Sequence, residues 1–452
     1  MKTGKHAVVI GGSMAGLLAA RALSEQFEQV TILERDHFPP PGQQRKGVPQ
    51  GRHAHGVLAQ GAQIFEGFFP GLTQELLEQG ALGSDIIQDG YWYQNGGFHA
   101  QFDSGLKGLL VSRPLLEGSI RQRVLSLGNV KALSRVNVRG LLSENGRVVG
   151  VKLDGDGLYE LRADLVVDAS GRGSQAPKWL EDMGYERPKQ EEVRIDLAYA
   201  TRIYRRSPQD FGGKDAFVIG SNAPLKRGGV VLHLEGQRWI VTLAGFLGDH
   251  PPIDEQGFLE FARTLPVPDI YNLIKEAEPL SEIGAYKFPG SQRRRYEKLA
   301  RFPRGFLVMG DAMCSFNPIF GQGMTVAASQ ARLLLEVLKA GSENLAQRFY
   351  KKAAVLVDGP WSIAVGADLS YPEVEGPRSP MVNFINWYVA KLHIAARRDP
   401  ALVLAFQEVA NLMAPPPSLL APGTALRVLW GNLFPRKPTV ARRPGVSPQA
   451  GD

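Results

Sequence analysis

The residues near the start of the chain that are best suited to chemistry are a glycine-rich turn, GGSMAG at residues 11–16, and an acidic residue, Glu34. Glycines permit a tight turn, and the N–H groups of a helix that follows it bind a pyrophosphate. A carboxylate about 20 residues further on is suited to ribose hydroxyls and argues against a 2′-phosphate. The spacing therefore predicts a nucleotide site for FAD or NAD rather than NADP.

A strand–turn–helix–strand unit would position these residues. The apolar runs 7–10 and 30–33 predict buried strands, and residues 17–23 predict a helix packed on the sheet. Ser13 replaces the second glycine of the G-x-G-x-x-G pattern, but a serine is small and its hydroxyl can bond a phosphate or cap the helix. The alternatives are an ordinary strand–helix turn and a secretory signal behind Lys2 and Lys5. The glycines and the immediate second strand favour the folded unit.

Two further motifs follow predicted strands. DASGRGS occupies residues 168–174 after the strand predicted at 161–167, and GDAMCSFNPIFGQGMTVAA occupies residues 310–328 after the strand predicted at 306–309. Ligands bind at the carboxyl ends of strands in open α/β sheets. We therefore expect both motifs to join the glycine-rich turn at one site.

The three motifs resemble those of the FAD-dependent monooxygenases that share the para-hydroxybenzoate hydroxylase fold, over most of residues 1–345. The resemblance implies an α/β protein with a Rossmann-like FAD-binding domain of the glutathione reductase type. An inserted, mainly antiparallel β-sheet domain would bind the substrate, and a helical segment would end the chain. The resemblance also implies FAD as cofactor, O2 as co-substrate, and NADPH, NADH or a separate flavin reductase as the electron source.

The resemblance also implies which residues meet the cofactor. Asp311 would hold the ribityl chain or the pyrophosphate, Arg113 would contact the phosphate or ribityl region, and the helix beginning at 321–323 would face the pyrophosphate and the flavin ring. The full set of predicted cofactor-binding residues is Gly11, Ser13, Met14, Ala15, Gly16, Glu34, Arg35, Arg45, Lys46, Arg113, Asp168, Asp311, Gly321, Gln322, Gly323 and Met324.

A narrower resemblance rests on RKGVPQGRHAH at 45–55, SRPLLE at 112–117, DASGRGSQAP at 168–177 and CSFNP at 314–318. These stretches are similar to the flavin epoxidases of polyether antibiotic pathways, of the lasalocid epoxidase type. The similarity implies epoxidation of an apolar, alkene-containing substrate through a flavin hydroperoxide, in natural-product biosynthesis. No catalytic residue is assigned; the residues predicted to line the flavin are Val48, Pro49, Gln50, His53, His55 and Pro318.

Several alternatives stay open. The chain could be an aromatic hydroxylase, an FAD reductase or dehydrogenase acting on a polyprenyl-like substrate without oxygen insertion, or a non-enzymatic escort of a prenylated partner. No base that would ionise a phenol stands out, which agrees with epoxidation. His53 and His55 are either hydrogen-bonding partners of the flavin or structural residues. Cys314 suits packing better than nucleophilic catalysis, and residues 293–295, three arginines, suit a solvated surface better than a nicotinamide phosphate.

The composition of the 452 residues is that of a globular protein, with a net charge of +7 and a single cysteine. We expect a cytoplasmic protein with a small apolar substrate, without a metal, a nucleic-acid partner or a membrane-spanning segment. A flavin reductase is a possible partner, and the oligomeric state is not assigned. The predicted parts are an FAD-binding domain (1–83, 111–192 and 297–345), a substrate-binding sheet domain (84–110 and 193–296), a C-terminal helical region (346–434) and a disordered tail (435–452).

Overall fold

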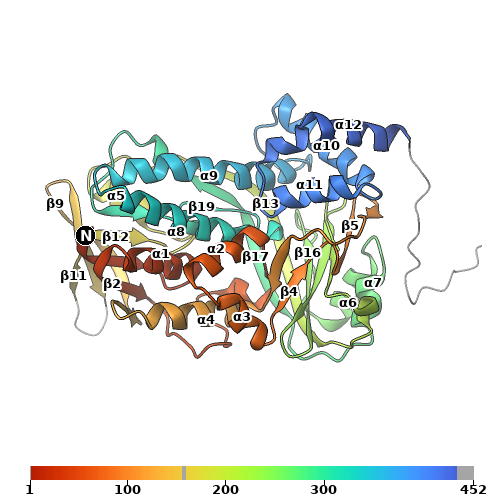
Figure 1. Ribbon diagram of the computed structural model, residues 1–452, viewed down its shortest axis with the longest axis horizontal. Coiled ribbons are helices and arrows are strands. Elements are labelled where there is room, and N and C mark those ends of the chain that lie inside the picture. Colours follow the sequence, from red (N-terminus) through yellow and green to blue (C-terminus); the bar gives the residue numbers. More distant parts are fainter. Residues whose placement is uncertain (1, 155–158, 435–452) are drawn as a thin grey trace, which may run out of the picture. The chain divides into compact units, whose positions relative to one another are not determined.

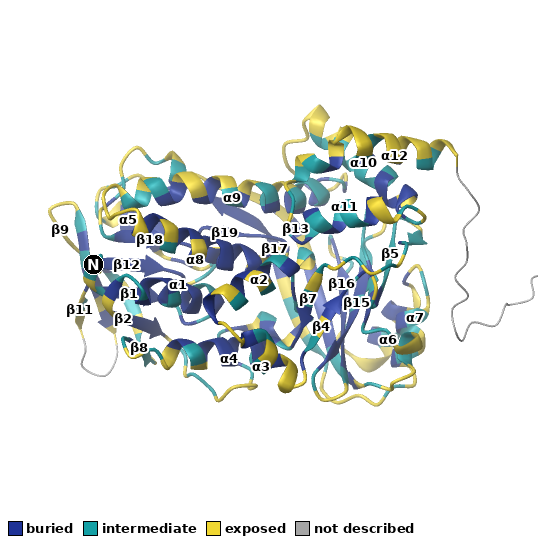
Figure 2. Cartoon of the chain, in the orientation of Figure 1, coloured by how far each residue is buried: buried dark blue, intermediate teal, exposed yellow. Residues whose placement is uncertain are grey.

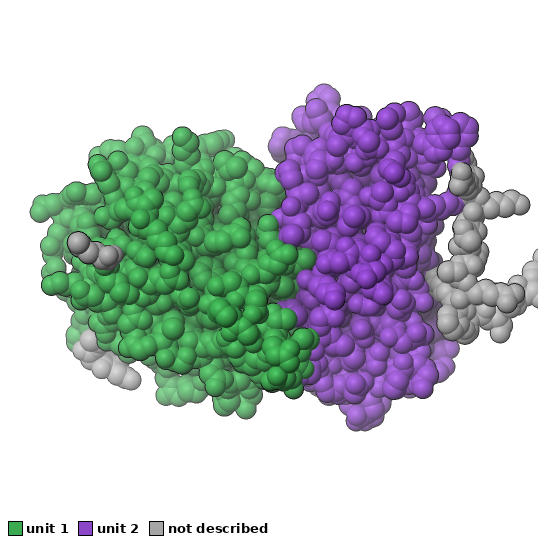
Figure 3. Space-filling view, in the orientation of Figure 1, with its two compact units in different colours: residues 1–79, 111–195, 289–368 green, residues 80–110, 196–288, 369–452 purple. Residues whose placement is uncertain are grey.

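The computed structural model describes residues 2–154 and 159–434 (Figure 1). The chain divides into two compact units (Figure 3). We call residues 1–79, 111–195 and 289–368 the first unit, and residues 80–110, 196–288 and 369–452 the second unit. The tail predicted at 435–452 lies outside the described residues.

A five-stranded parallel sheet forms the centre of the first unit. Its strand order is β18-β12-β1-β2-β8, in which Val8 of β1 pairs with Val166 of β12 and with Thr31 of β2. The last four residues of β1, from Ala7 to Ile10, are apolar and buried, as expected for a strand covered on both faces. The strands are β1 (Gly4–Ile10), β2 (Phe27–Glu34), β8 (Val130–Ser134), β12 (Leu165–Asp168) and β18 (Phe306–Val308).

Helices pack around this sheet. α1 buries its apolar residues from Leu17 to Leu23 and contacts α8, which in turn contacts α2 and α9. The helices of the first unit are α1 (Met14–Ser24), α2 (Ala59–Phe68), α3 (Leu72–Glu78), α4 (Arg113–Leu125), α5 (Ala176–Asp182), α8 (Gly323–Lys339) and α9 (Leu345–Asp368). The predicted α/β fold with a Rossmann-like unit is present in this arrangement.

A small antiparallel sheet joins β9 (Asn137–Glu144), β10 (Arg147–Asp154) and β11 (Glu160–Arg162). The predicted hairpin turn is present, with positive φ at Asn145 and Gly146. The single strand predicted at 161–167 is wrong, because β11 and β12 belong to different sheets. The chain is redirected between them where the Asp164 carboxylate accepts hydrogen bonds from the backbone N–H groups of Lys5 and His6.

The second unit is built on a mainly antiparallel sheet in which β13, β16, β15, β14, β5 and β6 follow one another. One face packs against α6 and α7 in a core that includes Phe217, Trp239 and Phe258. The strands are β5 (Gly90–Gln94), β6 (Gly97–Phe98), β14 (Ala216–Ile219), β15 (Arg227–Leu234) and β16 (Arg238–Gly245), beside the pair β4 (Leu82–Asp85) and β7 (Lys107–Leu110). The long strands β13 (Gln190–Arg205) and β17 (Gly284–Arg294) contain residues of both units. The helices are α6 (Glu255–Arg263) and α7 (Asp269–Ile274).

The helical region predicted at 346–434 does not form a part of its own. α9 belongs to the first unit, where it packs on α8, and α10 (Pro380–Ala395), α11 (Pro400–Ala410) and α12 (Pro422–Leu433) belong to the second unit. By contrast with α9, the helices α10, α11 and α12 contact one another. Within the described ranges, none of the helices combines the length and apolar character needed to cross a bilayer.

Candidate functional site

The glycine-rich turn connects β1 to α1. Gly11 has a φ of +101°, and a Cβ at Gly16 would lie 1.8 Å from the carbonyl oxygen of Gly11. Only glycine at position 16 therefore lets α1 approach the strand this closely. Ser13 is the N-cap residue of α1, but its side chain makes no capping bond. The N–H groups at the start of α1 are thus left to bind an anion.

The three sequence motifs meet at one edge of the parallel sheet. A Cβ at Gly11 would lie 2.6 Å from the carbonyl oxygen of Ala169, and a Cβ at Gly310 would lie 2.7 Å from the Cβ of Ala15. Arg294 connects the second and third motifs, because its guanidinium donates to the carbonyl oxygens of Arg172 (3.0 Å) and Ala312 (2.7 Å). The ends of β1, β12 and β18 therefore bring residues 11–16, 168–174 and 310–312 together.

The Asp168 side chain holds the loop of the second motif in place through hydrogen bonds. Its side chain is fully buried and accepts hydrogen bonds from the Ser170 N–H (2.9 Å) and the Ser174 hydroxyl (2.5 Å). Burial raises the pKa of Asp168, and the bonds from Ser170 and Ser174 oppose that rise. The side chain orders the loop, while Ser170 and Gly173 are exposed at its surface. Direct contact of Asp168 with a cofactor stays a prediction.

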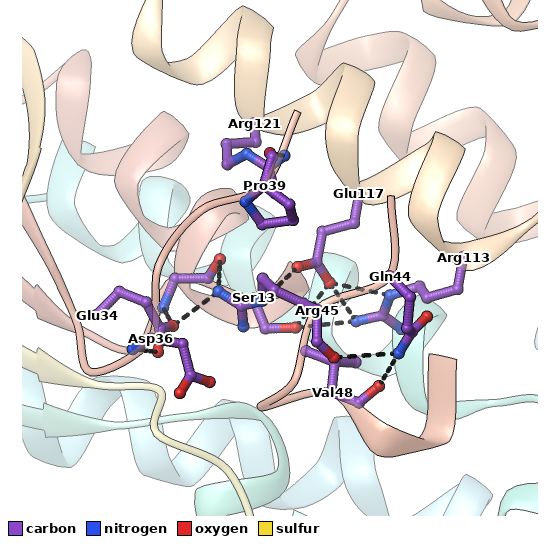
Figure 4. A network of polar contacts seen from close by, with 11 residues as sticks. Ser13, Glu34, Asp36, Pro39, Gln44, Arg45, Val48, Arg113, Glu117 and Arg121 are labelled. Atoms are coloured by element: carbon purple, nitrogen blue, oxygen red, sulfur yellow. Dashed lines mark hydrogen bonds and ion pairs between the residues drawn. The ribbon is translucent and has the colours of Figure 1, made fainter. Parts of the chain in front are cut away.

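A buried network of charges lies beside the glycine-rich turn (Figure 4). Glu34 accepts from the Gly12 N–H (2.8 Å) and from Arg45 Nη1 (2.9 Å). Glu117 pairs with Arg45 Nε (3.3 Å) and with Arg113 Nη2 (3.0 Å). The side chains of these four charged residues are at most 8% exposed. The network fixes Glu34, the predicted ribose acceptor, in position.

Serine at position 13 has a defined role in this network. Its hydroxyl donates to Glu117 Oε2 (2.9 Å) and accepts from Arg113 Nη2 (3.0 Å). Burial alone would raise the pKa of Glu117, but Arg113, Arg45 and the Ser13 hydroxyl outweigh burial and lower it. Glu117 is therefore an anion between two guanidinium groups at pH 7. The departure from the glycine pattern joins the turn to α4.

Asp311 is accessible in a region that disfavours its charge. The residue is exposed although both neighbours, Gly310 and Ala312, are buried. Burial raises the pKa of its carboxyl group, and the charges of Arg113 and Arg172 oppose that rise. Asp311 is therefore within reach of a ligand that binds at the third motif.

The start of α8 leaves backbone accessible in the same way as the start of α1. Gly321 has a φ of +65°, Gly323 is exposed with open space at its Cβ position, and Gln322 makes no side-chain cap. The Oε1 atom of Gln322 and the Oγ1 atom of Thr325 are buried without a hydrogen-bonding partner in the described part of the chain. Met324 is buried and Pro318 is exposed. Buried polar atoms without partners at a helix start favour a bound polar group there.

The loop at 45–58 brings two neutral histidines to the site. Burial lowers the pKa of His53 to about 4, and burial together with the charge of Arg113 lowers the pKa of His55 to about 4. His55 Nδ1 lies 2.9 Å from the carbonyl oxygen of His53. Since a carbonyl only accepts, Nδ1 carries the proton, which leaves Nε2 of His55 as an acceptor at pH 7.

The remaining predicted residues of this region differ in accessibility. Val48 is buried, Gln50 is half-buried, and three residues are exposed: Arg35, Lys46 and Pro49. Arg45 forms ion pairs with Glu34 and Glu117. Its predicted contact with cofactor phosphates stays a prediction.

The residues of the first unit fit a flavin dinucleotide. A dinucleotide requires helix N-termini without side-chain caps, glycines that leave space for the phosphates, and an acid at the end of the second strand. These features occur at Gly16, Gly323 and Glu34, and Asp311, which is near Gly323 in the sequence, is exposed.

Sequence reasoning missed two functional elements. Glu117 had a usable signal, since it follows Arg113 by four residues on a predicted helix, the spacing of a helical ion pair. The other element had none: Asn317 Nδ2 donates to Asp368 Oδ1 (2.7 Å), and the Asn317 N–H donates to the Ser291 hydroxyl (3.1 Å). Burial raises the pKa of Asp368 to about 7, against the hydrogen bonds from Asn317 and Ser291. A titrating carboxyl group thus holds the loop that leads into α8.

The interpretation of residues 293–295 as a solvated surface is wrong. Arg293 is 1% exposed and pairs with Asp358 (2.7 Å), and Arg294 is buried between the second and third motifs. Both side chains have carbonyl or carboxylate partners on neighbouring elements, so they order the site from within. Burial raises the pKa of the Cys314 thiol, which agrees with a packing role.

Comparisons with known proteins agree with this geometry. Residues 7–178 match the family model described as FAD dependent oxidoreductase. Protein Rv3254 of Mycobacterium tuberculosis is 36% identical over 382 residues, which cover 81% of this chain and 80% of that protein.

More distant relatives include two enzymes of lipid chemistry. Squalene epoxidase 2 of Arabidopsis thaliana is 22% identical over 341 residues, covering 75% of this chain and 54% of that protein. Digeranylgeranylglycerophospholipid reductase 2 of Methanopyrus kandleri is 25% identical over 351 residues, covering 75% and 77%.

A solved structure confirms the predicted fold. The p-nitrophenol 4-monooxygenase PnpA from Pseudomonas putida DLL-E4 superimposes with a TM-score of 0.65 at 18% sequence identity, covering 91% of this chain and 99% of that one. At this identity the likeness establishes a shared architecture.

Proposed function

Because this chain belongs to the FAD dependent oxidoreductase family and is a homologue of protein Rv3254, we propose that it is a flavin monooxygenase that epoxidises an apolar, alkene-containing substrate. The observation that carries the proposal is the meeting of three motifs at one sheet edge, where Asp311 is exposed. The similarity to squalene epoxidase 2 supports an alkene as the reacting group.

The chain would divide the cofactor among four elements. The start of α1 would bind the pyrophosphate, Glu34 the adenosine ribose, Asp311 the ribityl region, and the start of α8 the flavin end. FAD, when bound, supplies the redox chemistry and the activation of O2. The protein's own contribution is to orient the substrate and to exclude water from the reacting centre.

The titrating groups near the site agree with epoxidation. His53 and His55 are neutral at pH 7 because burial lowers the pKa of each to about 4. An alkene transfers no proton before it accepts oxygen, whereas a phenol reacts best after a base has ionised it. His55, protonated at Nδ1, is suited to accepting a hydrogen bond at Nε2 and so to orienting a donor group.

A second candidate is reduction of an isoprenoid double bond without oxygen insertion. The similarity to the digeranylgeranylglycerophospholipid reductase favours it, because that relative is as similar to this chain as the squalene epoxidase. The two candidates share the cofactor site. In the first the substrate gains an oxygen atom, and in the second it gains hydrogen.

Labelled oxygen separates the two. The purified holoenzyme is given a polyene such as squalene, NADPH or NADH with a flavin reductase, and 18O2, and the product mass is measured. We expect one labelled oxygen atom in the product. Hydrogen gain without label would establish the reductase, and label from H2 18O alone would contradict direct oxygen transfer from O2.

A further inference from the structure

The last helices of the second unit turn large apolar side chains toward water. In α12, Leu426, Leu429, Trp430 and Leu433 are all exposed, and Trp430 is 63% exposed. Their spacing places them in one stripe along the helix, as in an amphipathic helix. The only buried residue of α12 is Val428, so the stripe faces away from the protein.

α10 extends this surface. Met381, Phe384 and Trp387 are exposed on it, and Trp387 is 57% exposed. The two helices pack closely: a Cβ at Gly431 would lie 2.7 Å from the Cβ of Ala395, and Asn432 Nδ2 donates to the Lys391 carbonyl oxygen. Figure 2 shows the exposed residues along both helices. We call the set the apolar face: Met381, Phe384, Trp387, Leu426, Leu429, Trp430, Leu433 and Phe434.

Exposed large apolar residues elsewhere include Tyr159, Ile253 and Val355, which lie far apart in the sequence. Single exposed residues are ordinary on a protein surface, whereas a group of eight on two neighbouring helices marks an interaction site. The group includes Trp387 and Trp430, and tryptophan is enriched at the headgroup level of membranes.

The charge beside the apolar face is basic. Residues 380–452 contain eight Lys or Arg and three Asp or Glu, and residues 436–443 contain four of these basic residues and no acid. A basic stretch directly after an amphipathic helix is the pattern of a segment that binds anionic lipid. Two copies of the chain meeting through this face would each carry this excess of basic residues, which disfavours a symmetric dimer.

We propose that the apolar face docks the protein on the anionic surface of a lipid membrane; the basic composition of the sequence that follows Phe434 supports an anionic surface. α12 lies parallel to that surface, with Leu429, Trp430 and Leu433 inserted at the headgroup level. Docking brings the enzyme to the phase in which an apolar substrate is dissolved. The apolar face shares no residue with the predicted cofactor site, so the proposal can be tested independently of the reaction.

Vesicle sedimentation of the full-length protein tests the proposal. Vesicles of phosphatidylcholine with one third phosphatidylglycerol are compared with vesicles of phosphatidylcholine alone. We expect binding to the anionic vesicles that falls at least tenfold in Leu429→Ser/Leu433→Ser, and at least tenfold when Arg436, Lys437, Arg442 and Arg443 are all changed to Gln. Val355→Ser, an equally exposed apolar residue of the first unit, is the matched control and keeps the binding of the parent protein.

Three results would overturn the proposal. They are an absence of vesicle binding, equal binding to neutral and anionic vesicles with no effect of the charge change, and a dimer in solution that Leu429→Ser/Leu433→Ser dissociates while vesicles do not bind. Far-ultraviolet circular dichroism of each variant establishes that it is folded. High salt should release the protein from anionic vesicles, since it screens the attraction of the arginines.

Discussion

The two units place unusual residues in opposite environments. The first unit buries four charged side chains, Glu34, Arg45, Arg113 and Glu117, in one network, whereas the second unit exposes eight large apolar side chains on α10 and α12. Buried charge is tolerated only where each group has partners, and exposed apolar surface of this extent is typical of surfaces that another body covers. The comparison indicates that the first unit is organised around a polar ligand and the second around an apolar environment.

Removing the charge at the centre of the network should have the largest effect. Glu117→Gln leaves Arg45 and Arg113 buried beside a neutral amide, and we expect a loss of about 3–5 kcal/mol in the free energy of unfolding. Urea denaturation measures this loss, and flavin content measures the effect on the cofactor site. Glu144→Gln, which breaks an exposed pair with Arg162, should cost less than about 1 kcal/mol. Equal losses in the two variants would contradict a special role of the network.

The carboxyl group at the end of α9 should make stability depend on pH. Burial raises the pKa of Asp368 to about 7, so the neutral form is favoured in the folded protein. Its stabilisation is complete below about pH 4 and is lost as the pH rises to about 7. Asp368→Asn should remove this slope, which is worth about 4 kcal/mol. Ser291→Ala keeps the titrating group and should keep the slope; an unchanged slope in Asp368→Asn would refute the assignment.

A methyl group at the glycine-rich turn should weaken cofactor binding more than it weakens the stability of the fold. In Gly16→Ala the new Cβ meets the Gly11 carbonyl oxygen, so α1 must shift, at a cost of about 1–3 kcal/mol. We expect the affinity for FAD, measured by equilibrium titration, to fall at least tenfold. Gly67→Ala, where nothing lies within 4 Å of the new Cβ, should leave FAD binding unchanged and stabilise α2 by about 0.5–1 kcal/mol. Parallel losses in both variants would mean that the turn has no special geometry.

The smallest effect on stability is expected on the apolar face. Leu429→Ser removes an apolar side chain that makes little contact with the protein, so the free energy of unfolding should change by no more than about 0.5 kcal/mol. Leu243→Ser, in the core of the second unit, is the contrasting variant and should be severely destabilised. A large loss in Leu429→Ser would show that the face is part of the core.

Much of the first unit was predictable because its signals are local. Apolar runs identify β1, β2 and β18, and the motif after each strand lies at the carboxyl edge that the fold dictates. The burial of Arg293 and the pairing of Asn317 with Asp368 were not predictable, because both join elements tens of residues apart through tertiary packing. The division of residues 346–434 between the units was missed for the same reason. Helix periodicity reveals an apolar face but not the surface it meets.

The apolar face of α10 and α12 was also not predictable from the sequence. The sequence of α12 reads as an ordinary apolar helix, and only the structure shows that Val428 points inward while Leu429 and Trp430 point outward. The buried network likewise depends on Ser13 and Glu117, residues 104 positions apart that a hydrogen bond joins.

Titration of the flavin-free protein with FAD and with NAD tests whether the first unit is an FAD site. We expect one FAD per chain, with an affinity that falls at least tenfold in Gly16→Ala and is unchanged in Gly67→Ala. Binding of NAD in preference to FAD, or FAD binding that Gly16→Ala does not weaken, would contradict it.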